Sequence, residues 1–304
     1  MGPRVFGVEH RAEIIFLGVF ATWRESCFFG FDYNGIVDMH LNNSIKRPML
    51  ISHRGAHREA PENSRSGFEM ALDYGVDGIE TDVQLTRDGI PVLFHDATTY
   101  RVTGRRKRIS AYTRDELKAF DLGRNGASEK IPTLAEALEL FGNRTSLLIE
   151  IKSRKHDRLS GRSQALTDKV IAEIVPYSTG IREKIRVLSF DPDVLEQVNR
   201  AAPWLKCVLN TDGTGAWCVP AADLVRGRVA LNFLSAVCLD KKDLSSQVVT
   251  WTHARGMEIF TYCCNTRPQV ERALALGVDG IMSDRPGWLA GLFKCIDRTA
   301  DIDY

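Results

Sequence analysis

Ionisable side chains gather where predicted strands end. Four segments carry them: Ser52–Gly55, Ile79–Asp82, Phe94–Asp96 and Ile149–Lys152. Side chains alternate along a strand, so Glu80 and Asp82 point the same way, and Glu150 repeats the pattern on another strand. Any one of these acids alone could be a salt-bridged core residue or a solvated edge residue. Three at one predicted face, with no His or Cys alongside, favour an all-oxygen site that suits Mg²⁺ or Ca²⁺ better than Zn²⁺.

Two histidines and two cationic side chains accompany the acids. A lone His at a strand end is commonly a hydrogen-bonded structural residue, but His53 and His95 share a predicted face with the carboxylates. Imidazole titrates near neutral pH, so the pair fits a general base and a general acid. Arg54 can grip phosphate oxygens in a fork, and Lys152 can neutralise charge that builds on them. Together with a metal ion, these groups indicate displacement at phosphorus.

Other polar residues have less support as catalytic or ligand-binding residues. Five histidines have no reactive neighbours in the sequence, and surface or capping roles are expected for them: His10, His40, His57, His156 and His253. The basic run Arg105–Arg108 could steer an anionic substrate, although such a run is more typical of a solvated loop. Cys263 and Cys264 are adjacent in a predicted strand and should face opposite ways. The sequence contains no Ser/His/Asp nucleophile set, P-loop or zinc-ligand spacing.

Short β-rich runs alternate with amphipathic helical stretches from Met49 onward, and these elements must position the reactive groups. The predicted strands are Met49–Ser52, Gly78–Val83, Pro91–Phe94, Leu147–Ile151, Ile185–Ser189, Lys206–Leu209, Val229–Asn232, Glu258–Thr261 and Gly280–Met282. The predicted helices are Ser64–Tyr74, Thr133–Phe141, Leu166–Tyr177, Pro192–Ala201, Lys241–Arg255, Pro268–Leu276 and Trp288–Phe293. This alternation is typical of a parallel sheet covered by helices.

Local signals support the order of elements. Thr133 and Glu136 form a capping box, and Asp191 offers a capping carboxylate ahead of Pro192. The sequence Gly-Val-Asp-Gly-Ile occurs at 75–79 and again at 277–281, as the same helix-to-strand joint. Roughly eight strands over about 245 residues predict an α/β fold closed into a (β/α)8 TIM barrel. An open doubly wound sheet is the alternative, but its G-x-G-x-x-G fingerprint is missing after the first strand.

One barrel domain is predicted, with additions. Residues 1–48 form an N-terminal extension of unknown role, 49–295 the barrel and 296–304 a C-terminal tail. A small polar and basic insertion is expected between the early strands and Thr133. The apolar run Ile14–Phe20 is too short to cross a bilayer, which takes about 20 residues. No transmembrane segment is expected elsewhere.

Composition indicates which binding partners and which cellular compartment to expect. The 304 residues carry 40 Lys+Arg against 39 Asp+Glu, and a net charge of +1 leaves no electrostatic footprint for nucleic acid or an anionic membrane. The seven cysteines are odd in number and scattered, which indicates free thiols in a reducing compartment and predicts a cytoplasmic protein. An exported form is less favoured because Glu9 and Glu13 interrupt the basic start of a signal peptide. No oligomeric state is predicted.

Taken in order, these segments resemble the glycerophosphodiester phosphodiesterase family. The matching stretches are His53–Gly55, Pro61–Ser64, Gly78–Val83, Thr86–Gly89, His95–Asp96, Arg101–Gly104, Ile131–Leu134, Ile149–Lys152, Ser189–Pro192, Asn265 and Asp279–Pro286. The resemblance spans about residues 49–293. It implies a TIM barrel, one divalent cation, either Mg²⁺ or Ca²⁺, and hydrolysis of small glycerophosphodiesters to glycerol 3-phosphate and an alcohol. That activity would be a hydrolase step in lipid and glycerol metabolism.

The resemblance also implies roles for single residues. The metal ligands would be Glu80, Asp82 and Glu150. The acid/base pair would be His53 and His95. The contacts to phosphate and to the metal site would be Arg54 and Lys152.

Two positions depart from the family pattern. Ser64 replaces a usual Thr but keeps a hydroxyl that can cap a helix. Tyr262 replaces a usual Trp and should give the substrate site an aromatic wall of different shape.

A reaction scheme follows as a hypothesis. One imidazole removes the proton of a cation-bound glycerol hydroxyl, which attacks phosphorus to form a cyclic phosphate, while the other imidazole protonates the departing alcohol. Water then opens the ring. Direct attack by metal-bound water is an alternative, and either His53 or His95 could be the base. Two other functions stay open: lysophospholipase D-type hydrolysis of larger phosphodiesters, and a barrel that only binds phosphorylated ligands.

Overall fold

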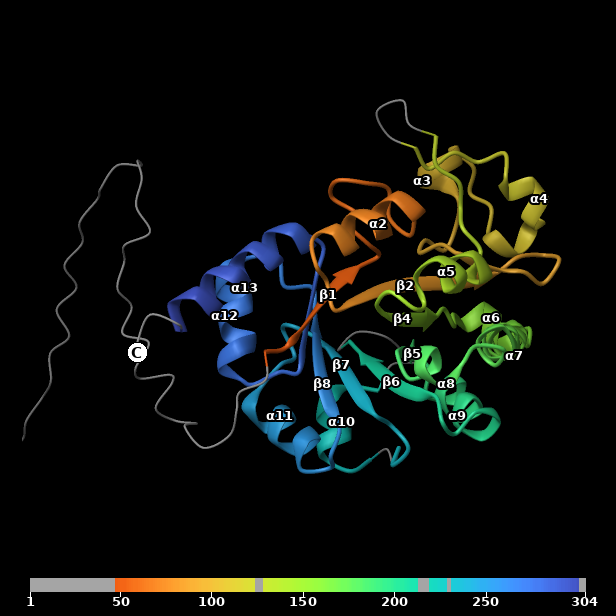
Figure 1. The fold of residues 1–304 in the computed structure, drawn as a ribbon. Coiled ribbons are helices and arrows are strands. Elements are labelled where there is room, and N and C mark those ends of the chain that lie inside the picture. The colour runs from red at the N-terminus through yellow and green to blue at the C-terminus, as the bar shows by residue number, and fades with distance from the viewer. Residues whose placement is uncertain (1–46, 124–127, 213–218, 229–230, 301–304) are drawn as a thin grey trace, which may run out of the picture. The chain divides into compact units, whose positions relative to one another are not determined.

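Eight parallel strands close into a barrel within the residues that the structure describes, 47–123, 128–212, 219–228 and 231–300 (Figure 1). In order round the ring they are β1 (Met49–His53), β9 (Gly280–Ser283), β8 (Glu258–Tyr262), β7 (Ala236–Asp240), β6 (Lys206–Thr211), β5 (Ile185–Ser189), β4 (Ser146–Ile151) and β2 (Gly78–Leu85). Pairing between β1 and β2 closes the ring. The computed structural model therefore confirms the predicted (β/α)8 TIM barrel.

Helices lie outside the ring of strands (Figure 1). The longer ones are α2 (Arg65–Asp73), α5 (Leu134–Phe141), α7 (Arg162–Ile174), α9 (Pro192–Ala201), α11 (Ser246–His253), α12 (Arg267–Ala275) and α13 (Pro286–Ala300). Shorter ones are α3 (Tyr100–Thr103), α4 (Arg114–Leu117), α6 (Lys155–Leu159), α8 (Thr179–Arg182), α10 (Ala221–Val225) and the 3-10 turn η1 (Ile109–Ala111). Every long helix was expected from the sequence, with bounds that differ by a few residues at most ends.

The predicted helix-start and helix-stop signals are confirmed. Thr133 and Glu136 form a reciprocal capping box at the start of α5. The carboxylate of Asp191 accepts a hydrogen bond from the backbone N–H of Asp193 at the start of α9. Ser64 caps α2, because its Oγ accepts from the N–H of Gly67. Glycine follows two helices in the left-handed conformation, with φ of 80° at Gly75 and 74° at Gly277.

The alternation of side chains along each strand divides the core into two layers. Outward-facing residues of β2 such as Ile79 and Val83 are buried together with helix residues such as Leu138 and Val170. Inward-facing residues form a separate cluster that fills the lower barrel: Ile51, Leu148, Leu188, Val208, Ala236, Cys238, Phe260 and Met282. The next inward positions toward the carboxyl ends of the strands are mostly polar: His53, Glu150, Asn210, Asp240 and Tyr262. The barrel is therefore plugged with apolar groups below and charged above.

The predicted strand Pro91–Phe94 is not a barrel strand. It is β3 (Pro91–Leu93), which pairs antiparallel with the upper half of β2. The sequence pattern cannot distinguish a parallel barrel strand from an antiparallel strand outside the ring, because a short apolar run is compatible with both. β3 opens the expected insertion, which has a small core of its own: Val92, Phe94, Ile109, Tyr112, Leu117 and Ile131.

The predicted strand Val229–Asn232 is wrong. The strand at this place in the barrel is β7, Ala236–Asp240, while Leu231 is buried in the outer core from a loop. Residues 229 and 230 lie outside the described residues. Both runs are short and apolar, and only pairing with β6 and β8 distinguishes them.

The domain boundaries fall largely outside the described residues. Of the predicted extension 1–48, only Arg47 and Pro48 are described. At the other end, α13 runs to Ala300, past the boundary at residue 295. Among the described residues, no helix combines the length and apolarity that a membrane span requires.

Candidate active site

The pairing of strands brings the predicted site residues together. In the register of the barrel, Asp82 on β2 lies opposite Glu150 on β4, and His53 on β1 lies opposite Glu80 on β2. His53 and Glu150 face inward, because they lie two residues beyond Ile51 and Leu148 of the inner cluster. Glu80 and Asp82 share that side, because they pair with Leu148 and Glu150 in the register of β2 and β4. The register alone therefore places a carboxylate pair and a histidine at one side of the barrel mouth.

Glu80, Asp82 and Glu150 form a compact buried cluster. One carboxylate oxygen from each lies within 4.8 Å of the others, and all three side chains are at least 90% buried. The ammonium of Lys152 lies between two of them, 2.6 Å from Asp82 Oδ1 and 2.5 Å from Glu150 Oε1. The guanidinium of Arg54 pairs with Asp82 at 3.2 Å from the other side. Three negative charges thus face two positive ones.

The electrostatics of this cluster leave room for a cation. Burial, together with repulsion from Asp82 and Glu150, raises the pKa of Glu80 well above its ordinary value. Burial also raises the pKa of Glu150. Burial acts the same way on Asp82, but Lys152 and Arg54 outweigh it and hold the pKa of Asp82 well below its ordinary value. A divalent cation would remove the repulsion that Glu80 feels, and three carboxylates are the oxygen donors it prefers.

His53 is fixed by a carboxylate that the sequence did not single out. Its Nδ1 lies 2.6 Å from Asp284 Oδ1, which follows β9, and its Nε2 lies 3.9 Å from Glu80 Oε2. Asn265 donates to the second oxygen of Asp284 at 2.6 Å. Burial lowers the pKa of His53, and the hydrogen bond to Asp284 opposes that effect.

His57 also belongs to this network, which corrects the expectation of a surface or capping role. Its Nε2 lies 2.9 Å from Asp284 Oδ1. His57 follows β1 by a single turn, and that turn returns it to the barrel mouth. His57 lies in a loop, where side chains follow no periodic pattern, so the sequence alone could not predict its place at the barrel mouth.

His95 reaches the same mouth by a different route. It follows the antiparallel β3, not a parallel strand as the sequence suggested, and the N–H of Phe94 donates to the carbonyl of Asp82 at 2.9 Å. Its Nδ1 lies 3.1 Å from Asp96 Oδ1. Arg101 donates to Asp96 at 2.8 Å and also pairs with Glu62. Burial lowers the pKa of His95, partly offset by the nearby Asp82.

Asn63 is a further site residue. In the sequence it stands out only as part of Pro61–Ser64, one of the stretches that resemble the family. Its Nδ2 donates to Asp82 Oδ2 at 2.8 Å, and its Oδ1 accepts from Thr81 Oγ1 at 2.7 Å. The side chain is 1% exposed, and its backbone has a φ of 51°. The amide thus fixes one oxygen of a candidate metal ligand.

The turn after β1 shapes the approach to the cluster. Arg54 and Gly55 have φ of 57° and 79°. A Cβ on Gly55 would lie 2.8 Å from the backbone carbon of Gly67, so only glycine lets the start of α2 come this close. The same turn directs the N–H of Arg54 at Glu80, 3.2 Å from Oε2.

Tyr262 lies farther round the ring. Its strand, β8, is separated from β2 by β9 and β1. The hydroxyl donates to the carbonyl of Thr211 at 2.9 Å, and the ring packs edge-on against Phe190. The structure places Tyr262 at the barrel mouth but not among the clustered charges.

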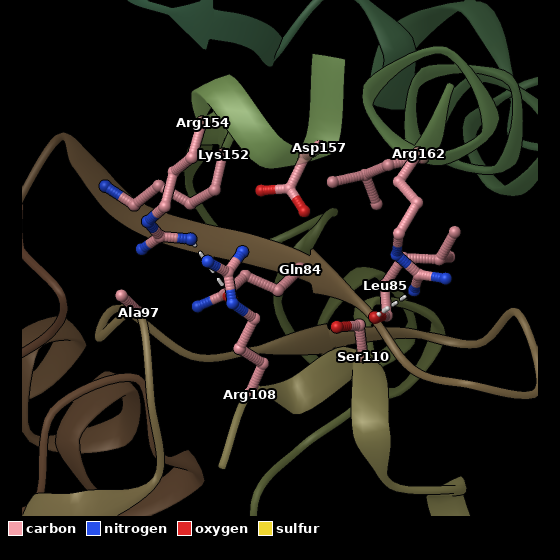
Figure 2. A pocket seen from close by; sticks show the side chains of 10 residues that line it. Gln84, Leu85, Ala97, Arg108, Ser110, Lys152, Arg154, Asp157 and Arg162 are labelled. Carbon is pink, nitrogen blue, oxygen red and sulfur yellow. Dashed lines mark hydrogen bonds between the residues drawn. The ribbon is translucent and has the colours of Figure 1, made fainter. Parts of the chain in front are cut away.

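Two hollows lie near the barrel mouth, and one of them is lined by His95. The first, of about 790 Å³ including solvent, is lined by His95 with Pro61, Glu62, Asn63, Phe94, Arg101, Val102, Asp121, Leu122 and Gly123. The second, of about 360 Å³ including solvent, is shown in Figure 2 and lined by Gln84, Leu85, Ala97, Arg108, Ser110, Lys152, Arg154, Asp157, Arg162 and Leu166. Lys152 belongs to both the cluster and the second hollow. A small polar substrate could therefore extend from the charged cluster into either one.

Comparison with known proteins agrees with this arrangement. Residues 53–288 match the glycerophosphoryl diester phosphodiesterase family. A glycerophosphodiester phosphodiesterase of Caldanaerobacter subterraneus is 31% identical over 255 residues, covering 82% of this chain and 98% of the relative. One from Bacillus altitudinis is 31% identical over 241 residues, covering 78% of this chain and 94% of the relative.

Solved structures share the fold. An Oleispira antarctica phosphodiesterase, in complex with the product sn-glycerol-3-phosphate, aligns with a TM-score of 0.69 at 23% identity, over 81% of this chain and 97% of that one. A glycerophosphodiester phosphodiesterase from Thermotoga maritima aligns with a TM-score of 0.64 at 24% identity, over 81% of this chain and 99% of that one. Because the family match covers most of the sequence, and the similarity to the two named relatives covers nearly their whole length, the chain belongs to the glycerophosphoryl diester phosphodiesterase family.

Proposed function

We propose that this protein hydrolyses glycerophosphodiesters to glycerol 3-phosphate and an alcohol, using a divalent cation and two histidines. One observation carries the proposal: three buried carboxylates lie at the barrel mouth with a carboxylate-held imidazole on each of two flanking elements. The product bound to the Oleispira antarctica relative supports the choice of substrate. Charged residues line both hollows, which favours a water-soluble diester over a lysolipid.

Glu80, Asp82 and Glu150 would hold the cation, and Asn63 would fix the orientation of Asp82. When bound, a divalent cation would polarise a phosphate oxygen and make a nearby hydroxyl more acidic. Arg54 and Lys152 supply fixed positive charge beside the same carboxylates, and both would contact the phosphate. Mg²⁺ and Ca²⁺ both suit this donor set.

The two histidines would move the protons. Asp284 engages His53 at Nδ1 and leaves Nε2 on the side of Glu80. Asp96 engages His95 at Nδ1, which leaves its Nε2 for proton transfer. Each carboxylate fixes the tautomer and the direction of its ring, so one imidazole can accept a proton from the attacking hydroxyl while the other donates one to the departing alcohol.

A turnover assay tests the proposed activity. Purified protein is given glycerophosphocholine, glycerophosphoethanolamine and a lysolipid, with Mg²⁺ and Ca²⁺ in parallel, and glycerol 3-phosphate is measured. We expect release from the first two substrates, loss of release with EDTA, and recovery when metal is restored. Activity that persists in excess EDTA would remove the cation from the proposal, and activity on the lysolipid alone would replace the substrate class.

Metal binding has a readout that does not depend on turnover. A cation that binds only the folded protein raises the melting temperature, and the rise grows with the logarithm of the cation concentration above its Kd. We expect Mg²⁺ or Ca²⁺ to raise the melting temperature of the wild-type protein and to have little effect on Glu80→Gln. Glu69→Gln is the control, because Glu69 is exposed on α2 and pairs only with Arg65 in the described residues. An equal shift in all three proteins would place the cation elsewhere.

A further inference from the structure

The smaller hollow beside the active site is strongly basic. Its lining includes four cationic side chains, Arg108, Lys152, Arg154 and Arg162, and a single carboxylate, Asp157. Figure 2 shows Arg108 and Arg154 entering from opposite walls, with their guanidinium groups directed toward each other. Like charges held face to face are stable only when an anion or solvent lies between them.

The arginines are anchored by neutral groups. Arg154 donates to Gln84 Oε1 at 3.2 Å and to the carbonyl of His95 at 2.7 Å. Arg162 donates to the carbonyls of Leu85 and Thr86 at 2.7 and 2.9 Å. Within the described residues, no carboxylate lies within 4.0 Å of the charged nitrogens of Arg154, Arg162 or Arg108. Their charge is therefore available to a ligand.

Burial of Arg154 affects how strongly this hollow would attract an anion. Burial lowers the pKa of Arg154, and the charge of Arg108 adds to that effect against the pull of Asp157. An arginine that has lost part of its water gains more from a bound anion than an exposed one does. The hydroxyl of Ser110 lines the same hollow and offers a further donor.

The basic hollow adjoins the reaction centre. Lys152 lines it and also pairs with Asp82 and Glu150. Arg154 holds the backbone of His95, so the hollow begins next to one of the two candidate acid/base groups. The larger hollow, lined by His95, carries two carboxylates, Glu62 and Asp121, against one fixed cation, Arg101, so the smaller hollow is the more favourable one for an anion.

We propose that the basic hollow binds an acidic group carried by the alcohol part of the substrate. The preferred substrates are then glycerophosphodiesters whose alcohol bears a second phosphate or a carboxylate. This inference rests on the proposed function, and it adds a specificity site formed by Arg108, Arg154 and Arg162. The ester bond that breaks and the groups that break it are unchanged.

A matched pair of substrates tests the inference. One is the diester of glycerol 3-phosphate with ethylene glycol, and the other carries a phosphate on the free hydroxyl of the glycol. The quantity measured is the ratio of kcat/KM for the phosphorylated diester to that for the neutral one. We expect the wild-type ratio to exceed one, to fall with added salt, and to drop by about tenfold in Arg108→Gln, as for the loss of one charge-assisted hydrogen bond.

The basic run 105–108 supplies its own control. Arg105 carries the same charge in the same loop but does not line the hollow, so Arg105→Gln should keep the wild-type ratio. Arg108 is exposed, and its substitution should leave the melting temperature within about a degree of wild type. Arg108→Glu should lower the ratio further than Arg108→Gln, which gives a second variant if the first is poorly behaved.

Three outcomes decide the question. A ratio near one in the wild type, or one that Arg105→Gln lowers as much as Arg108→Gln does, overturns the specificity site while leaving the proposed function intact. No turnover of either diester, nor of glycerophosphocholine, overturns the proposed function itself. Inorganic phosphate should inhibit the phosphorylated diester more than the neutral one, and equal inhibition or activation of both would assign the hollow to a free anion instead.

Discussion

His53 and His95 are held in the same way by unrelated parts of the chain. Each presents Nδ1 to a carboxylate, from the loop after β9 in one case and from its own next residue in the other. A carboxylate at one ring nitrogen fixes the tautomer and leaves the other nitrogen for chemistry. The two imidazoles are therefore oriented before substrate arrives.

Replacement of either imidazole should abolish most of the activity. His53→Ala and His95→Ala should each lower kcat by about a hundredfold or more, the usual contribution of a positioned acid or base. The measurement is steady-state turnover at saturating metal. His253→Ala is the control, because His253 is exposed at the end of α11 and contacts Asp279. Near-wild-type kcat in both site variants would end the acid/base assignment.

Asn63 combines a buried amide with a strained backbone, and the two effects can be separated. Asn63→Ala removes the hydrogen bonds to Asp82 and Thr81 and should cost about 1–3 kcal/mol of stability. It also keeps a φ of 51°, which alanine adopts at a cost of about 1 kcal/mol.

Asn63→Gly also removes the amide, but glycine adopts a φ of 51° without steric cost. It should therefore be more stable than Asn63→Ala by about 1 kcal/mol, while both lose activity to a similar extent. Chemical denaturation gives the first comparison and turnover the second. Activity retained in both variants would show that Asp82 needs no amide to hold it.

The sequence indicated the ionisable residues of the site but not their supports. Glu80, Asp82 and Glu150 stand out because acids are rare inside predicted strands. Asn63 and Asp284 lie in loops, where such residues are common, and their roles depend on contacts with β2 and β1. A support of this kind has no local signature, so only the fold reveals it.

At the scale of elements, the hairpin of β2 and β3 determines where His95 lies. β2 is longer than most of the barrel strands, and its upper half pairs with β3, which turns the chain back toward the mouth. Gln84 secures the return, because its Nε2 donates to the carbonyls of Phe94 and Asp96 at 2.6 and 2.9 Å. One buried amide thus fixes the residues on both sides of His95.

Gln84→Ala should therefore loosen this histidine without removing it. We expect kcat to fall by about tenfold or more, because small displacements of a catalytic group cost rate steeply. The melting temperature should fall by only a few degrees. Gln197→Ala is the control, since Gln197 makes comparable amide hydrogen bonds to Gln164 and Asp168 on the outer helices. Equal loss of kcat in both variants would indicate a general effect on stability.

Element prediction succeeded where periodicity and end signals agree. Helices with capping residues, such as α5 and α9, begin where the sequence indicated. The two errors, β3 and β7, involve short apolar runs whose partners decide their role. Strand pairing is a property of the closed ring, which no window of a few residues contains.

At the scale of the whole molecule, a half-buried acid on an outer helix should make the free energy of unfolding depend on pH. Burial raises the pKa of Glu173, on α7, to about 7. Its Oε2 has no hydrogen-bond partner among the described residues. The folded state therefore favours the protonated form, so the associated stability is full below the ordinary pKa of a glutamate and is lost as pH rises through about 7.

Thermal denaturation at two pH values checks the direction of this pH dependence. Glu173→Gln should melt near the wild-type temperature at about pH 4 and above it at about pH 8, where the wild-type carboxyl is ionised. Glu139→Gln, at an exposed position on α5, should show the same difference from wild type at both pH values. A wild-type advantage at the higher pH would contradict the raised pKa.

The hydrogen bond between His53 and Asp284 joins residues 231 positions apart, across the seam where the first and last strands of the barrel pair. Nearly the whole domain must be synthesised before that seam can form. The proposed role of His53 therefore predicts that a nascent or partly refolded chain, which has its acids but not an oriented His53, does not cleave diesters. In a refolding experiment, the return of turnover would then report the joining of the two ends of the sheet, a contact between residues far apart in the sequence, and such contacts form slowly.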